Sequence, residues 1–372
     1  MRYKEYSFCL ILDFMKHLTP LFALLLFAAC TPNSNQEENT SWQLRPFVKV
    51  DSLNPVLEAL ANTTFYCPVR KDTVRWEEKD VFNPSAVVRD GKVYLLYRAE
   101  DTVGKHAGTS RLGLAVSEDG LHFTRMAEPV FYPDEDSMKM YEWEGGVEDP
   151  RLVEDEKGRY ILTYTAYDGN LARLCVASSP DLIHWTKHGL AFKDHPELWS
   201  KSGAIITARQ QDQFVATKIN NHYYMYWGDT DIFLATSDNL VDWTPVFDGD
   251  ELLKVFSPRP GKFDSDLVEP GPHAMLQEDG ILLIYNSRNK LEKGDQQLPD
   301  GNYAAGQILL NKENPAEVLK RSENYFITPD KDYEITGQVN NVCFVEGLVH
   351  FKNRWFLYYG TADSKIAVAV AE

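Results

Sequence analysis

Two adjacent carboxylates, Glu148 and Asp149, lie in the segment GGVEDPRL at residues 145–152. Gly-Gly and Asp-Pro are common in turns, so the segment alone is compatible with an ordinary acidic surface loop. A carboxyl group beside a proline is also held on a stiff backbone, because proline has a fixed φ and no N–H. Glu148 would raise the pKa of Asp149 by repulsion, whereas Arg98 or Arg151 would lower it. Arg151 also offers Glu148 an ion-pair partner. The segment therefore contains a candidate acid whose pKa its neighbours can adjust.

One pattern returns five times after residue 75: a turn, then a β-rich run that ends in polar residues. The copies span residues 89–101, 156–168, 219–231, 278–289 and 352–363. Runs of Tyr, Val, Ile, Leu and Thr bounded by Asp-Gly, Lys-Gly or Asn-Asn are strand and hairpin signals. A repeat of about 60 residues with several strands per copy is typical of propeller blades. We predict an all-β fold, a five-bladed β-propeller.

The inner strands of a propeller line a central channel. Polar residues recur at the starts of the expected inner strands and at the ends of the strands that follow them, so both sets should meet at one mouth of the channel. Those at the starts of inner strands are Asn83, Asp149, Glu269 and Asn341, and those at the exits of the following strands are Arg98, Asp168, Asp231 and Asp363. A concave mouth that carries carboxylates, arginine and aromatic side chains suits a sugar, which needs hydroxyl partners and stacking faces.

The N-terminus predicts export. Met15-Lys16-His17 followed by LTPLFALLLFAAC is typical of a signal peptide, and its apolar part is too short to span a bilayer. Ala28 and Ala29 before Cys30 resemble a bacterial lipobox. We therefore expect residues 1–30 to be a signal peptide with Met15 as an alternative start, and Cys30 to be lipidated. Residues 31–75 would form a tether and N-terminal extension, and residues 76–372 the propeller. The alternative is a plainly secreted protein.

Composition excludes some partners and sites. The net charge is -17 and the pI about 5.0, whereas nucleic-acid binding needs a cationic face. The only membrane contact expected is the lipid anchor, which would hold the exported protein at a bacterial membrane, periplasmic or on the cell surface. The five cysteines contain no CxxC pair and give no zinc spacing. We expect buried free thiols, no metal and no cofactor.

Several motifs together resemble glycoside hydrolase family 130, in the right order from about residue 81 to the C-terminus: FNPSAVV, LLYRAED, GVEDPRL, FDSDLVEPGP and LYYGTADSKIAVA. The resemblance implies a five-bladed propeller that acts on β-mannosides with inversion. It implies that Asp149 is the catalytic acid and passes its proton through a substrate hydroxyl. It also implies that Asn83, Arg98 and Asp363 hold the first sugar.

Two departures from the phosphorylases of this family favour hydrolysis. Those enzymes carry a His-Arg pair for phosphate where this chain has Trp227-Gly228. Phosphate recognition favours arginine geometry, which Trp-Gly cannot supply. Glu269 stands where phosphorylases have a small residue, and it could act as general base for water or bind sugar hydroxyls. An inverting pair with water between its members would place the carboxyl groups of Asp149 and Glu269 roughly 6.5–9.5 Å apart.

Other candidates each have two interpretations. Lys218 would contact the sugar or end a solvated strand. Trp227 would be a stacking platform or core, and Asp229 a sugar ligand or second base, or a turn residue. Tyr303 and His273 are also near the expected mouth, with a core position favoured for Tyr303. For the whole protein, the expected partner is an oligosaccharide. The leading hypothesis is an exported inverting β-mannosidase, and the alternatives are a β-mannoside phosphorylase and a non-catalytic glycan-binding propeller.

Overall fold

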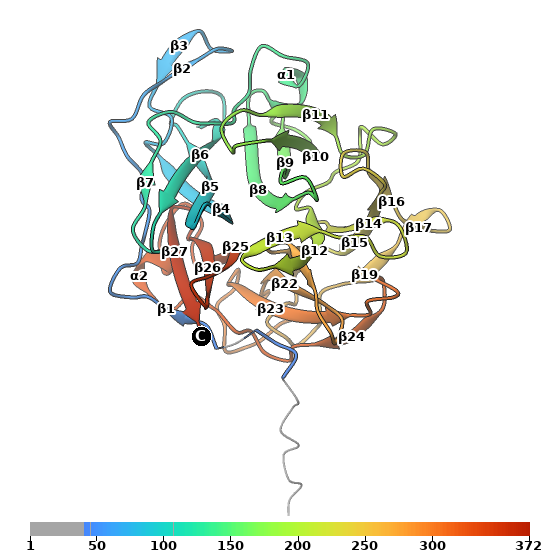
Figure 1. Cartoon of the computed structure of the whole chain (residues 1–372). Helices are drawn as coiled ribbons and strands as arrows, with labels where there is room; N and C mark the ends of the chain where they lie inside the picture. The colour runs from blue at the N-terminus through green and yellow to red at the C-terminus, as the bar shows by residue number, and fades with distance from the viewer. Residues whose placement is uncertain (1–40, 45, 107) are drawn as a thin grey trace, which may run out of the picture. The chain divides into compact units, whose positions relative to one another are not determined.

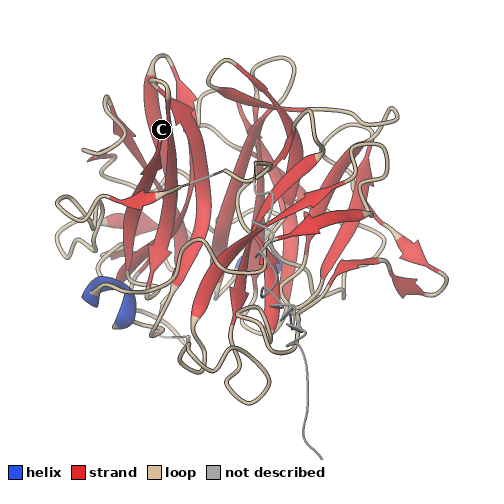
Figure 2. Cartoon of the chain, turned by 90° about the horizontal axis from the view of Figure 1, so that it is seen from below, coloured by secondary structure: helices blue, strands red, loops and turns tan. Residues whose placement is uncertain are grey.

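The computed structural model describes residues 41–44, 46–106 and 108–372. The predicted leader and the lipidation site Cys30 lie outside these residues. The chain divides into residues 1–40 and a compact unit of residues 41–372. This unit is nearly all β, with only two short helices among the described residues, α1 (Lys139–Glu142) and α2 (Asp332–Ile335). Figure 2 accordingly shows strands and loops almost throughout.

Most strands pair antiparallel in five successive sets. The first is β4 (Asp80–Arg89), β5 (Lys92–Glu100), β6 (Ser110–Ser117) and β7 (Thr124–Arg125). The second is β8 (Gly146–Glu154), β9 (Tyr160–Tyr167), β10 (Ala172–Ser179) and β11 (Thr186–Leu190). The third is β12 (Ala204–Gln210), β14 (Tyr223–Trp227) and β15 (Ile232–Ser237), with β13 (Gln213–Ala216), β16 (Thr244–Pro245) and β19 (Lys254–Phe256).

The fourth set is β20 (Leu267–Pro270) and β21 (Ala274–Leu276), β22 (Ile281–Arg288), β23 (Tyr303–Leu310) and β24 (Val318–Arg321). The fifth is β25 (Cys343–Phe351), β26 (Arg354–Thr361), β27 (Lys365–Ala371) and β1 (Val48–Lys49). Two small hairpins complete the strands, β2 (Phe65–Cys67) with β3 (Asp72–Val74), and β17 (Phe247–Asp248) with β18 (Glu251–Leu252). In Figure 1 the sets follow one another, with β4, β8 and β25 near the middle of the view.

The turn signals in the sequence form tight hairpins. Asp90 and Gly91, between β4 and β5, have φ of 50° and 70°, and Asn220 and Asn221, between the bridged residues Ile219 and His222, have the same values. Two central residues with positive φ are the mark of a type I′ turn, whose twist matches that of the strands. The expected hairpins are therefore formed by the residues that a type I′ turn needs.

The core consists of five apolar clusters, each shared between neighbouring sets. The cluster between the first and fifth sets contains Trp76, Tyr97 and Phe356, all fully buried. The other clusters join the first set to the second, the second to the third, the third to the fourth, and the fourth to the fifth. Each set is thus covered on both faces, as the largely uninterrupted burial of strands such as β8 requires.

Residues 41–75, expected as a tether and extension, belong to the same compact unit as the strands. β1 adds a strand to the outer edge of the fifth set by pairing with β27. Trp42 and Phe65 are buried in two of the core clusters because their large apolar surfaces gain more from burial than from exposure. Cys67, Cys175 and Cys343 are free and buried, which confirms the expectation for the cysteines.

Candidate active site

A small pocket of about 140 Å³ collects polar side chains from all five sets of strands or the loops beside them. Its lining residues are Asn83, Arg98, Asp149, Lys201, Glu269, Tyr303, Val339, Val342, Phe344 and Asp363. Five of the residues selected from the sequence therefore meet here, namely Asn83, Arg98, Asp149, Glu269 and Asp363. The sequence segments that carry them are up to 280 residues apart (83 to 363), so only the closure of the fold brings them together.

Three of these residues have an unusual backbone: Asp363, in the turn after β26, has φ of 50°, and the other two lie within strands. Asn83 and Asp149 have φ of 46° and 48°, in the left-handed region that few non-glycine residues adopt. Each lies where the register of its strand shifts, between Phe82 and Pro84 in β4 and between Glu148 and Arg151 in β8. A β-bulge turns a side chain away from the regular alternation. The bulges thus explain how Asn83 and Asp149 face the pocket although the rest of β4 and β8 is packed in the core.

Asp149 is surrounded by hydrogen-bond donors. Asn83 Nδ2 donates to its Oδ1 at 2.9 Å, and Arg98 Nη1 donates to the same atom at 3.1 Å. Lys201 Nζ lies 3.4 Å from Oδ2. Burial acts to raise the pKa of Asp149, but the charges of Arg98 and Lys201 outweigh it and hold that pKa well below its usual range. In the free protein Asp149 is therefore a carboxylate.

The two adjacent carboxylates of the GGVEDPRL segment differ in their setting. Arg98 Nη2 contacts Glu148 at 3.0 Å and Glu100 at 2.8 Å, in addition to its contact with Asp149. For Glu148, burial prevails over the attraction of Arg98 and raises the pKa. The partner of Glu148 is thus Arg98, not Arg151 as the sequence suggested.

Arg151 instead connects the backbones on which the two candidate catalytic carboxylates stand. Its Nε donates to the carbonyl of Gly271 at 2.8 Å, Nη2 to that of Pro270 at 2.7 Å, and Nη1 to that of Asp149 at 3.2 Å. Nη2 also lies 3.0 Å from Oε1 of the fully buried Glu346. A guanidinium can satisfy several acceptors because its donors form a rigid fork. Arg151 therefore sets β8 against the end of β20.

Glu269 has the opposite electrostatic setting to Asp149. It is buried, and the hydroxyl of Ser202 donates to its Oε1 in a short contact. Burial raises the pKa of Glu269 to about 7, although Lys201 and Arg151 act to lower it. Burial also raises the pKa of Asp363 to about 7, against the charge of Arg98. Glu269 thus exchanges a proton near neutral pH, as a group that takes a proton from water must.

The other residues selected from the sequence do not line the pocket, namely Trp227, Lys218, Asp229, His273, Asn341, Asp168 and Asp231. Asp168 and Asp231, expected at the mouth, are instead paired at 2.8 Å with Arg173 and Lys254. Trp227 is buried, with its ring 4.7 Å from that of Phe192 and 4.9 Å from that of Phe233. The ammonium of Lys218 lies over the ring of Tyr223 at 4.9 Å. Asp229 accepts a hydrogen bond from the indole of Trp199 at 2.9 Å, next to the loop that carries Lys201. His273 is buried with its ring 4.2 Å from that of Phe214.

Sequence reasoning missed several residues of the pocket. Lys201, which lines the pocket, and Ser202, which contacts Glu269, were not selected. They lie just before β12, as Asn83 and Asp149 lie near the starts of β4 and β8, and this common position was the available signal. Tyr303 lines the pocket, whereas a core position was favoured for it. Phe344 and Glu346 carried no signal, because their positions depend on how β25 packs against the other inner strands.

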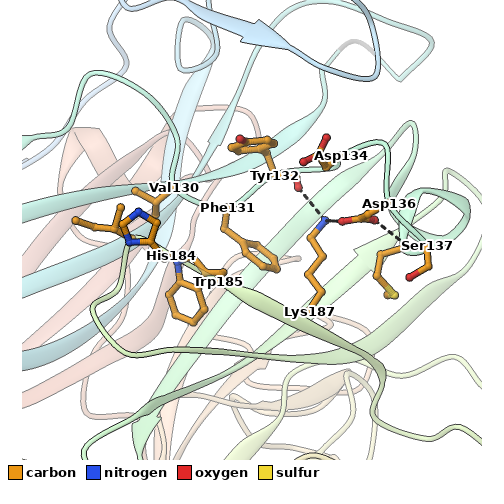
Figure 3. Close-up of a pocket in the computed structure, with 11 residues that line it drawn as sticks. Val130, Phe131, Tyr132, Asp134, Asp136, Ser137, His184, Trp185 and Lys187 are labelled. Atoms are coloured by element: carbon orange, nitrogen blue, oxygen red, sulfur yellow. Dashed lines mark hydrogen bonds and ion pairs between the residues drawn. The ribbon is translucent and has the colours of Figure 1, made fainter.

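A second hollow, of about 410 Å³, lies beside β11 and the segment before α1 (Figure 3). It is larger than the carboxylate pocket, but its lysine is paired: Lys187 Nζ contacts Asp136 at 3.1 Å and also Glu142, and donates to the carbonyl of Tyr132 at 2.9 Å. Chemistry rather than size therefore identifies the smaller pocket as the candidate active site. Within residues 41–44, 46–106 and 108–372, no group of side chains is arranged to hold a metal ion.

Known proteins resemble this chain over most of its length. Residues 54–372 match glycoside hydrolase family 130, described as β-1,4-mannooligosaccharide phosphorylase. A 1,2-β-oligomannan phosphorylase from Thermoanaerobacter sp. (strain X514) is 33% identical over 306 residues, which cover 80% of this chain and 91% of that protein. The β-1,2-mannobiose phosphorylase of the same organism is 30% identical over 85% of this chain and 97% of its own.

Solved structures are more similar still. A glycosyl hydrolase from Bacteroides ovatus is 45% identical with a TM-score of 0.87, over 89% of this chain and 95% of that one. Another structure has the same identity, coverage and TM-score, and its description states that the GH130 family of mannoside phosphorylases contains glycoside hydrolases that target β-1,2 mannosidic linkages in Candida mannan. The family match, the relatives and the assembled carboxylate pocket agree, and the chain belongs to glycoside hydrolase family 130.

Proposed function

We propose that this protein hydrolyses β-mannosides with inversion and releases mannose from manno-oligosaccharides, with β-1,2 linkages as the preferred substrate. One observation carries the proposal: Asp149 and Glu269 face one small pocket from different strands, in opposite electrostatic settings. An inverting glycosidase needs two facing carboxyl groups, one as its acid and one as its base. Here the proposed acid has the lower pKa, so the reactive form is the minor one in which the proton lies on Asp149 and Glu269 is charged. Family membership supplies the substrate class, mannosides.

In the proposed reaction, Glu269 takes a proton from a water molecule whose oxygen attacks the anomeric carbon. The glycosidic C–O bond breaks, and the leaving oxygen receives a proton from Asp149, through a sugar hydroxyl where the distance requires it. Each turnover therefore leaves Asp149 charged and Glu269 protonated, and the proton must return before the next one. Asn83 Nδ2 and Arg98 Nη1, which both donate to Asp149 Oδ1, hold the acid in place for this transfer.

Hydrolysis is favoured over phosphorolysis by the cations of the pocket. Arg98 is already paired with Glu100, Glu148 and Asp149, and Lys201 with Asp149. An incoming phosphate would have to compete for these cations with buried carboxylates. The curated relatives that are named phosphorylases are 24–33% identical, whereas the solved hydrolase from Bacteroides ovatus is 45% identical.

We also infer that the five strand sets are the blades of a β-propeller, since each apolar cluster is shared by two neighbouring sets. We further propose that the protein is exported and held at a membrane by a lipid on Cys30, because a hydrolase of external glycans acts outside the cytoplasm. None of the helices in the described part of the chain is long and apolar enough to cross a membrane.

The test is incubation of the protein with β-1,2-mannobiose in the presence and absence of inorganic phosphate. The expected product is free mannose at a rate that phosphate does not change. Formation of mannose 1-phosphate would establish phosphorolysis instead. Binding of the disaccharide without any cleavage, by the native protein and by Asp149→Asn alike, would identify a glycan-binding protein.

A further inference from the structure

An exposed tryptophan lies beside the loop that lines the pocket. Trp199 is 46% exposed, whereas the other seven tryptophans, all within the described residues, are buried or half-buried. An exposed indole offers a ligand a flat apolar face together with a polar N–H. Trp199 precedes Lys201, whose side chain lines the pocket, by only two residues. The exposed ring therefore belongs to the surroundings of the pocket.

The ring of Trp199 is also fixed in place. Its indole N–H donates to Asp229 Oδ2 at 2.9 Å, and Asp229 follows the end of β14. The backbone N–H of Gly228 donates to the carbonyl of Lys201 at 3.0 Å, which joins this turn to the loop before β12. Asp229 is close enough to the pocket for its charge to add to the rise that burial causes in the pKa of Glu269. An aromatic side chain held in this way binds a ligand with little loss of side-chain entropy.

We propose that Trp199, oriented by Asp229, is the platform for the sugar on the leaving-group side of the scissile bond. The proposal rests on the proposed function, since it assumes that a mannosyl unit occupies the pocket. Pockets that enclose drug-sized ligands measure about 300–1,000 Å³. The present pocket of about 140 Å³ therefore has room for one sugar ring and leaves the next at its mouth. The C–H face of a pyranose is apolar and its hydroxyls are wet, and tryptophan suits such mixed surfaces.

The assignment makes Trp199 a residue for substrate selection. Asp229 is a positioning residue, because it acts through the indole. Trp199→Ala should then matter only when a ring follows the scissile bond. The measurement is kcat/KM for β-1,2-mannobiose and for methyl β-mannoside, which has an alkyl leaving group without a ring. Trp199→Ala should lower the value for mannobiose by roughly 3- to 10-fold, the worth of an aromatic contact. The value for the methyl glycoside should stay within about twofold, as for surface changes generally.

Three variants sharpen the test. Trp199→Phe should restore most of the mannobiose rate, because it keeps a ring. Asp229→Asn should retain more activity than Asp229→Ala, because the amide oxygen can still accept from the indole. Tyr66→Ala is the control. It removes another exposed aromatic residue, which lies on β2, is 59% exposed and does not line the pocket, and it should leave kcat/KM unchanged for both substrates.

A binding experiment separates this proposal from the proposed function. In the Asp149→Asn background, calorimetry compares mannobiose with mannose, with and without Trp199→Ala. A selective loss of mannobiose affinity supports the platform even if the native protein cleaves neither glycoside, in which case only the proposed hydrolysis fails. Equal losses for the two ligands, or no loss for either, would overturn the platform whatever the activity of the enzyme.

Discussion

Lys201 offers the sharpest test of the electrostatics of the pocket, through the change Lys201→Met. Its Nζ lies 3.4 Å from Asp149 Oδ2, and its side chain is 20% exposed. Burial acts to lower the pKa of Lys201, but Asp149 and Glu269 raise it well above its usual range, so the lysine is a cation at every working pH. Methionine keeps much of the length of the side chain and removes the charge. The substitution therefore isolates the electrostatic role of Lys201.

The size of the effect follows from Coulomb's law. Two unit charges at that separation interact by about 5 kcal/mol at an effective dielectric constant of about 20. Water at the exposed part of the lysine reduces this, and an opposite charge at such range shifts a carboxyl pKa by about 1–3 units. We therefore expect Lys201→Met to raise the pKa of Asp149 by about 1–2 units, equivalent to about 1.4–2.7 kcal/mol. The charge of Lys201 also lowers the pKa of Glu269, so the substitution should raise that pKa by up to about one unit.

The pH dependence of kcat/KM is set by the protonation state of Asp149 and Glu269 together, not by either group alone. Hydrolysis needs one proton shared by Asp149 and Glu269: on Asp149 as the acid, while Glu269 is the free base. Below pH 7 most molecules of the free enzyme carry this proton on Glu269, and a small fraction carry it on Asp149. Because both forms hold one proton, the ratio between them does not change with pH. Above about pH 7, where Glu269 loses the proton, the pair is empty. The value of kcat/KM should therefore be level below pH 7 and fall about tenfold per pH unit above it.

The assay is kcat/KM for β-1,2-mannobiose between about pH 4 and 9. In Lys201→Met the pH at which kcat/KM begins to fall (the falling limb) should rise by up to about one pH unit. A uniform loss of sugar binding would lower kcat/KM at every pH and would not move this limb. Lys218→Met, which removes a lysine that does not line the pocket, is the control and should leave the limb in place. The reasoning fails if the limb of Lys201→Met stays where it is in the native enzyme, or if the native rate rises through pH 7.

Three further changes have expected outcomes of their own. Glu269→Gln removes the proposed base and should lower kcat by about 10²–10⁴-fold with little change in KM, and an unaltered kcat would exclude the role. Asp101→Ala leaves Arg111, fully buried and 2.7 Å from that carboxylate, without its ionic partner, and should cost about 3–5 kcal/mol in urea unfolding. Glu154→Gln, away from the pocket, should raise Tm at pH 8 relative to the native protein and much less at pH 5. Burial raises the pKa of Glu154 to about 7, so the stability that its protonated form contributes is lost as pH rises through that value; an equal gain at both pH values would contradict this.

The elements of the fold were predictable where local chemistry decides them. The β-rich runs became strands. The Asp-Gly pair at 90–91 and the Asn-Asn pair at 220–221 became turns with two positive φ values. The boundary between extension and strands was less predictable, because residues 41–75 contain no copy of the repeat that marks the other strands. β1 is only two residues long and exists by its pairing with β27, which lies more than 300 residues further along the chain.

The residues of the candidate site that share a position in the repeat could be predicted from the sequence. Contacts between residues of different repeat copies could not. Asn83, Asp149 and Glu269 each precede a proline, and all three line the pocket. The ion pair of Arg151 with Glu346 joins residues 195 positions apart (151 to 346), and no spacing rule connects them. Trp227 was a candidate stacking platform with a core position as its alternative, and the rings of Phe192 and Phe233 that pack against it could not be assigned to it from spacing.

The backbone of Asp149 explains why the acidic segment cannot be an ordinary turn. A left-handed non-glycine residue costs about 1–3 kcal/mol, and it persists only where the surrounding contacts determine it. At Asp149 these contacts are Asn83 and Arg98 on the side chain and Arg151 on the carbonyl. In an exposed hairpin the turn itself sets such a φ, as at Asp90, whereas Asp149 lies within a buried strand, where these partners set it. The strain is therefore tolerated where it turns a carboxylate into the pocket, and the same contacts that hold the bulge also set the charge of the group it presents.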